Sequence, residues 1–147
     1  MRLFLKHFWP GMVWFLVILL LTLLPGNYFP KVQDFWQLFK PDKLIHLSIF
    51  AIFAFLLLMG AYRQYARSGN RYNTRIFPVL VSLTTGVITE MLQAFLPLGR
   101  EASVFDVLAN FTGTVAGYLL FRLAENNYLK REKKIYDLRF ERINRKS

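Results

Sequence analysis

Four apolar runs constrain the fold of this chain more than any other feature. They cover residues 8–24, 44–62, 76–96 and 104–123, and charged side chains are nearly absent from them. A helix needs about 20 apolar residues to cross the hydrocarbon core of a bilayer. The runs therefore predict an all-α, polytopic membrane protein with four transmembrane helices.

Composition narrows the class of protein further. The sequence has 147 residues, is 54% hydrophobic and carries a formal net charge of +10. In a soluble protein this charge would suggest a nucleic-acid partner, but the basic residues lie mostly outside the apolar runs, so we expect no nucleic acid. Cysteine is absent, which removes disulfide and cysteine–metal frameworks. We expect one membrane domain over residues 1–123 and a basic cytoplasmic tail with a loose helical pattern over 124–147.

The distribution of Lys and Arg predicts the orientation of the helices. Fifteen of these residues precede the first run, lie between the second and third, or follow from Arg122 onward, and only 4 lie on the other side. Loops rich in Lys and Arg stay on the cytoplasmic side of a membrane. Both ends of the chain and the middle loop are therefore predicted to be cytoplasmic (N-in/C-in), which agrees with an even number of spans.

A short aromatic segment lies between the first two runs, over residues 27–41. Val32, Phe35, Trp36 and Phe39 follow the i, i+3, i+4, i+7 spacing of a helix face, and polar residues fill the other positions. The segment is too short and too polar to span a membrane. It is predicted to be either a short amphipathic helix in the membrane interface or an aromatic loop at that level.

Polar residues are expected to converge at the outer face. With the predicted topology, the run 44–62 begins there, 76–96 ends there, and 104–123 begins there. Glu90 lies inside its run, where a carboxylate at mid-membrane costs about 2.5–3.5 kcal/mol on insertion scales. The polar side chains expected near this face are Asp42, Lys43, His46, Glu90, Gln93, Arg100, Ser103, Asp106 and Asn110. An intramembrane carboxylate indicates a functional site by default.

The residue types at this corner are typical of general acid/base chemistry. We predict Glu90, His46 and Asp106 as catalytic residues, with the carboxylates and imidazole able to transfer or orient protons. Lys43 and Arg100 can hold a phosphate group, Arg by two-point contact. The predicted substrate-binding residues are Asp42, Lys43, Gln93, Arg100, Ser103 and Asn110. The same groups could also hold a divalent ion, but only one histidine is available and the spacing matches no metal motif. No metal and no cofactor are therefore assigned from the sequence.

Helix capping offers a simpler interpretation of some of these residues. Ser103-Val-Phe-Asp106 fits a capping box at the start of the last helix. Asp42, which follows a proline, can cap the second helix in the same way.

Helix packing offers a simpler interpretation of others. Gln93 and Asn110 can form hydrogen bonds between membrane helices, and the Gly113-x-x-x-Gly117 pattern is typical of a close helix contact. His46 can bind a backbone carbonyl at the interface. Glu90 has no such local explanation, because capping cannot supply a partner to a carboxylate in mid-helix.

The ordered set of motifs resembles the VanZ family of small bacterial membrane proteins. The matching pieces are Thr22-Leu-Leu-Pro25, Asp42-Lys43-x-x-His46-x-x-x-Phe50, Glu90-x-x-Gln93-x-x-x-Pro97-x-Gly99-Arg100, and Ser103-x-x-Asp106-x-x-x-Asn110-x-x-Gly113-x-x-x-Gly117. The resemblance covers most of residues 8–123. It implies a multi-pass protein of the bacterial cytoplasmic membrane. The family takes its name from a factor in resistance to the glycopeptide teicoplanin, and wider comparisons place it with proteins that act on lipid head groups or lipid-linked precursors.

These observations leave four hypotheses of function. The leading one is an enzyme that processes a lipid or lipid-carrier head group, with membrane lipids or lipid-linked precursors as its partners. The alternative is a non-enzymatic module that binds a glycopeptide, a lipid-linked precursor or a partner protein. A proton-coupled transporter and a purely structural role for the polar residues are the other two.

Overall fold

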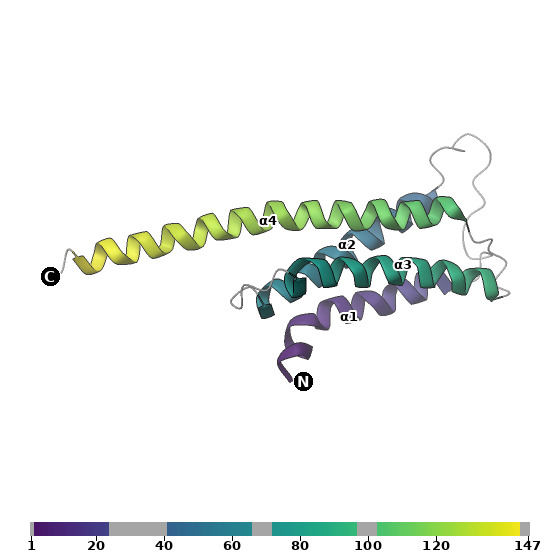
Figure 1. Ribbon diagram of the computed structural model, residues 1–147, viewed down its shortest axis with the longest axis horizontal. Helices are drawn as coiled ribbons and strands as arrows, with labels where there is room; N and C mark the ends of the chain where they lie inside the picture. Colours follow the sequence, from purple (N-terminus) through teal and green to yellow (C-terminus); the bar gives the residue numbers. More distant parts are fainter. Residues whose placement is uncertain (1, 24–40, 66–71, 97–102, 145–147) are drawn as a thin grey trace.

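The computed structural model describes residues 2–23, 41–65, 72–96 and 103–144, with side chains at 6–22, 43–65, 72–96 and 103–127. The helices are α1 (Arg2–Leu23), α2 (Pro41–Tyr65), α3 (Phe77–Phe95) and α4 (Val104–Asn144), with one π-helical turn, η3 (Tyr72–Ile76), leading into α3. Successive helices run in opposite directions, so the described ends of the chain lie at the same end of the bundle (Figure 1). The predicted all-α fold is confirmed.

Three helical segments are long and apolar enough to cross a membrane: Lys43–Tyr65, Tyr72–Phe95 and Val104–Asn127. The apolar part of α1, Lys6–Thr22, is shorter. Large hydrophobic side chains cover the outside of the bundle, as expected of helices that face lipid tails rather than water. Which end faces the cytoplasm stays a prediction, and the proposed interfacial helix falls on residues outside the described part of the chain.

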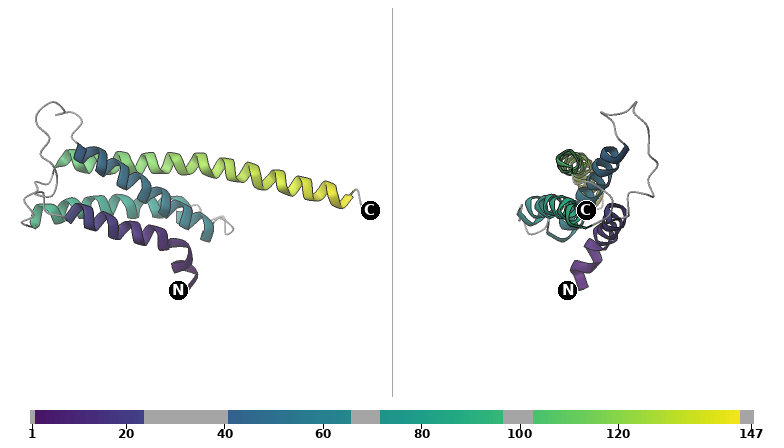
Figure 2. Two further views of the ribbon diagram at one scale, coloured as in Figure 1. Left: turned by 180° about the vertical axis from the view of Figure 1, so that it is seen from behind. Right: turned by 90° about the vertical axis from the view of Figure 1, so that its right-hand side faces the viewer.

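The helix boundaries differ from the sequence prediction in two informative places. α1 begins at Arg2, so Pro10 lies inside the helix rather than in its first turn. Proline removes one intrahelical hydrogen bond and bends a helix, and α1 is bent in its N-terminal part (Figure 1). α4 continues to Asn144 through the segment predicted as a tail. Its 41 residues extend about 60 Å at 1.5 Å per residue, so it projects beyond the other helices (Figure 2).

α2 is the central helix and packs along both α4 and α1. A Cβ atom at Gly113 would overlap the carbonyl oxygen of Leu47, and one at Gly117 would overlap that of Ala51. Only glycine permits this approach of two backbones, so the packing interpretation of the two glycines is confirmed. On the other side of α2, Trp14 Nε1–H donates a hydrogen bond to the Ile49 carbonyl at 2.9 Å and fastens α1.

Candidate functional site

Three helices bring His46, Glu90 and Asp106 together inside the bundle. All three residues are buried, with exposed fractions of 2%, 4% and 6%. His46 lies on α2, Glu90 on α3 and Asp106 on α4, each within about 8 Å of the helix end on the same side of the bundle. The predicted convergence is therefore present, while the catalytic roles stay a prediction.

Asn110 connects the members of this cluster. Its Nδ2 donates to Glu90 Oε1 at 3.2 Å and lies 3.4 Å from the Gly86 carbonyl oxygen. Its Oδ1 accepts a hydrogen bond from His46 Nδ1 at 3.0 Å, and the same ring nitrogen lies 3.5 Å from Glu90 Oε1. Asn110 thus links α2 to α3 through its two amide atoms and fixes the orientation of both titratable side chains.

Glu90 is only partly satisfied by these contacts. Its second oxygen, Oε2, is buried and has no hydrogen-bond partner of good geometry among the described residues, although the Ser103 backbone N–H lies close to the carboxylate. Asp106 is close enough for electrostatic repulsion between the two carboxylates. Burying a polar atom without a hydrogen bond costs free energy. A bound group that pairs with this oxygen would offset that cost, so the cluster is suited to bind a ligand.

The local sequence explains how the cluster is assembled. An added Cβ at Gly86 would lie 3.0 Å from the Asn110 Cβ, so glycine makes room for the amide. At the start of α4, Ser103 Oγ accepts the Phe105 N–H at 3.2 Å, and the Ser103 carbonyl accepts the Asp106 N–H at 2.9 Å. Ser103 therefore caps α4 as its sequence predicts. Asp106 lies in the first helical turn, where the helix dipole stabilises a carboxylate.

The other predicted binding residues have different surroundings. Lys43 Nζ lies 4.3 Å from the centroid of the Phe105 ring, a cation–π contact at the same end of the bundle. Gln93 Nε2 donates to the Thr22 carbonyl at 2.7 Å and joins α3 to α1, which agrees with its alternative interpretation as an interhelical contact. The side chains of Asp42 and Arg100 lie outside the described part of the chain.

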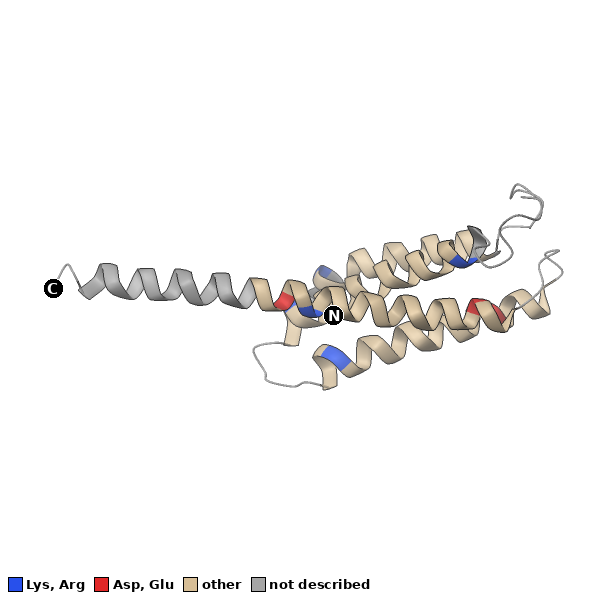
Figure 3. Cartoon of the chain, turned by 90° about the horizontal axis from the view of Figure 1, so that it is seen from above, with Lys and Arg blue, Asp and Glu red and all other residues tan. Residues whose placement is uncertain are grey.

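A second polar contact, which sequence reasoning missed, lies at the opposite end of the bundle. Arg75 Nη2 donates to both oxygens of Glu125, at 2.9 and 3.0 Å, and Glu125 is buried. The described acidic residues accordingly gather in two places, one toward each end of the spans (Figure 3). The sequence predicts Arg75 in the loop before the third run and Glu125 in the tail. No local spacing relates two residues that are 50 positions apart.

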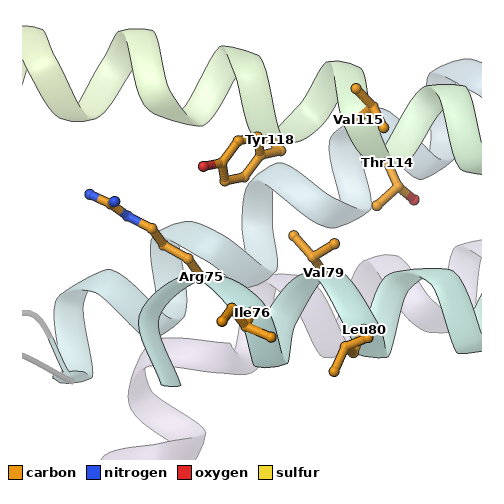
Figure 4. A pocket seen from close by; sticks show the side chains of 7 residues that line it. All are labelled: Arg75, Ile76, Val79, Leu80, Thr114, Val115 and Tyr118. Carbon is orange, nitrogen blue, oxygen red and sulfur yellow. The ribbon is translucent and has the colours of Figure 1, made fainter. Parts of the chain in front are cut away.

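Among the grooves on the surface of the described residues are two that the residues of the His46 cluster do not line. The larger, about 400 Å³, lies between α3 and α4 toward the Arg75 end (Figure 4); it is lined by Arg75, Ile76, Val79, Leu80, Thr114, Val115 and Tyr118. Its walls are almost entirely apolar, so it suits an acyl chain better than a head group. The smaller, about 330 Å³, lies between α2 and α4 and is lined by Lys43, Leu44, Leu47, Phe105, Leu108, Ala109 and Thr112.

A comparison with protein-family models decides the family. The VanZ/LLP1 model matches residues 4–125. The chain belongs to the VanZ/LLP1 family. Membership and the helices together make it a multi-pass membrane protein. No curated protein and no solved structure matched the chain significantly. The matched segment of this VanZ/LLP1 protein contains all three residues of the cluster and Asn110, whereas most of the α4 extension lies beyond it.

Proposed function

We propose that this VanZ/LLP1 protein processes the head group of a membrane lipid or a lipid-linked carrier, by hydrolysis or transfer, at the His46–Glu90–Asp106 cluster. One observation carries the proposal. A buried carboxylate in a membrane helix, Glu90, lies beside an imidazole and keeps one oxygen without a hydrogen bond among the described residues. Structural interhelical contacts normally satisfy such an atom, whereas an acid/base group needs it for the reacting proton.

The depth of the cluster suits a head group. His46 and Glu90 each lie about 7 Å along their helices from the nearest described helix end. The phosphate groups of a lipid occupy the region next to the hydrocarbon core, where the spans end. The excess of Lys and Arg at the other end supports an outer-leaflet position in a bacterial cytoplasmic membrane.

In the proposed reaction, Glu90 takes a proton from the attacking water or alcohol. The oxygen of that nucleophile bonds to the phosphorus, the bond from phosphorus to the head-group alcohol breaks, and the alcohol leaves with a proton returned by the acid. Protonated His46 is this acid and gives its proton to the leaving alcohol, and Asp106 orients the imidazole. Glu90 then passes the proton that it took to His46, which restores both groups. Asn110, through its contacts to both His46 and Glu90, holds the pair in position.

The groove beside Lys43 supports a lipid substrate. Its mouth carries the Lys43 ammonium group, and its walls are mainly the apolar side chains of α2 and α4. A phosphate can pair with the ammonium while an acyl chain lies along Leu47 and Leu108. The groove lies against the helices that carry His46 and Asp106, so a bound lipid would have its head group near the cluster.

Lipid mass spectrometry on four strains tests the proposal. The strains carry no copy, the wild type, Glu90→Gln, or Glu125→Gln, each variant at wild-type abundance in the membrane. Glu125→Gln is the matched control, because it also converts a buried carboxylate on a membrane helix to an amide, at the end away from the cluster. We expect the wild type and Glu125→Gln to deplete one lipid and accumulate its product, and Glu90→Gln to match the null strain. A Glu90→Gln strain with the wild-type profile would refute catalysis by this residue.

The alternative function is a binding module for a glycopeptide, a lipid-linked precursor or a partner protein. One observation favours it: the groove beside Lys43 is open, whereas the residues of the cluster are buried. In that case Lys43→Gln weakens binding of the precursor to the purified protein, and no lipid changes mass in any strain.

A further inference from the structure

Three buried side chains in the bundle are arranged as metal ligands. His46, Glu90 and Asp106 each offer one ligand atom, and these atoms lie within 4.8 Å of one another. All three come from different helices. For this reason no metal motif is visible in the sequence, where ligands usually reveal themselves by short spacings.

The unpartnered oxygen of Glu90 is the second observation. Oε2 is buried and makes no hydrogen bond to any described residue. The first oxygen already accepts from Asn110 at 3.2 Å. The carboxylate is thus oriented through one oxygen, and the other oxygen, which has no hydrogen bond to a described residue, can bind an ion.

The distances also fit a common ion. Two ligand atoms that are each about 2.1 Å from a metal lie about 3.0 Å apart in octahedral and about 3.4 Å apart in tetrahedral geometry. His46 Nδ1 lies 3.0 Å from Asn110 Oδ1 and 3.5 Å from Glu90 Oε1. To bind the ion through this nitrogen, the imidazole takes the tautomer with its proton on Nε2, which gives up the hydrogen bond to Asn110. Atoms on opposite sides of an octahedral ion lie about 4.2 Å apart. Because the three ligand atoms lie within 4.8 Å of one another, they need to move by well under 1 Å to bind one ion.

Charge balance favours a divalent ion. Glu90 and Asp106 are two carboxylates in a low-dielectric interior, and no described Lys or Arg forms an ion pair with Glu90. Two negative charges in such a place repel each other and are poorly solvated. A dication offsets both charges and gives Glu90 Oε2 a partner.

We infer that His46, Glu90 and Asp106 form a binding site for one divalent transition-metal ion of the Zn²⁺ or Mn²⁺ class, with Asn110 as a supporting oxygen donor. An imidazole nitrogen selects these ions over Mg²⁺ and Ca²⁺, which prefer oxygen ligands alone. Three protein ligands leave at least one position open, as in catalytic metal centres. The site does not depend on the proposed lipid chemistry, because an ion here also joins α2, α3 and α4. With the ion bound, Glu90 Oε2 is a ligand and is not free to act as the base.

Metal titration of the purified protein tests the inference without any lipid substrate. The full-length protein, with its affinity tag removed, is stripped with EDTA in nanodiscs and titrated with Zn²⁺ by calorimetry. We expect one ion per chain, with Kd at least about 100-fold weaker in Glu90→Gln and Asp106→Asn. Glu125→Gln, about 28 Å from Asp106 along α4, keeps the wild-type Kd. Equal Kd values in the wild type and in folded Glu90→Gln overturn the site.

Cobalt spectroscopy keeps the inference testable if the ligand variants do not fold. Wild-type protein loaded with Co²⁺ is expected to show visible ligand-field bands that an equal amount of Zn²⁺ removes and an equal amount of Mg²⁺ does not. Absence of these bands, or equal displacement by Mg²⁺, overturns the inference. Zn²⁺ binding without a change in any lipid would instead refute only the proposed function.

Discussion

The contact between α2 and α4 gives the sharpest prediction of stability. In Gly113→Ala the new methyl group meets the Leu47 carbonyl, which is backbone and cannot rotate away. Restoring an ordinary contact moves the two helices apart by on the order of 1 Å. Overpacking of this kind costs about 1–3 kcal/mol, while the better helix propensity of alanine returns about 1 kcal/mol.

Gly11→Ala is the matched control. Its added methyl lies 3.0 Å from Leu57 Cδ2, the far end of a flexible side chain that can turn aside. Both substitutions gain the same propensity, so the difference between them isolates the cost of backbone contact. We expect Gly113→Ala to be less stable than Gly11→Ala by about 1–3 kcal/mol.

Reversible unfolding with SDS in mixed micelles, followed by circular dichroism, measures this difference. A second readout follows from the geometry, because His46 and Asn110 lie next to the displaced contact and their 3.0 Å hydrogen bond would leave bonding range. Gly113→Ala should therefore also weaken Zn²⁺ binding, while Gly11→Ala should not. Equal stability of the two variants would show that the helices are not as closely packed as described here.

Three further experiments separate structural from functional roles. Gln93→Leu removes the hydrogen bond to the Thr22 carbonyl and should lower the free energy of unfolding by about 0.6–1.7 kcal/mol without changing the lipid profile; loss of lipid turnover at normal stability would restore its predicted binding role. Ser103→Ala removes the cap of α4 and should cost about 1 kcal/mol in the same unfolding assay. In a double-mutant cycle, Arg75→Gln and Glu125→Gln should show a coupling of at least about 0.5 kcal/mol, because the contact is two-pronged and the carboxylate is buried; additive effects would contradict this.

The sequence by itself determined the kind of protein. Apolar runs of membrane-crossing length forced helices, because lipid supplies no partner for an unpaired backbone group. The same reasoning placed Ser103 as a cap and the two glycines of α4 in a helix contact, since both are local consequences of residue type. It also directed attention to His46, Glu90 and Asp106, because polar groups are costly in such runs.

Only the tertiary structure decided what these residues touch. Helical phase gives a face but not the identity of the neighbour across it, so the sequence could not show that Asn110 joins His46 to Glu90. Nor could it show that Gln93 turns to α1, or that one oxygen of Glu90 makes no hydrogen bond within the described part of the chain. These contacts join residues 20 to 71 positions apart, and their distances depend on how closely whole helices pack. That closeness is set by backbone contacts at small residues, a property of the assembled bundle rather than of any one segment.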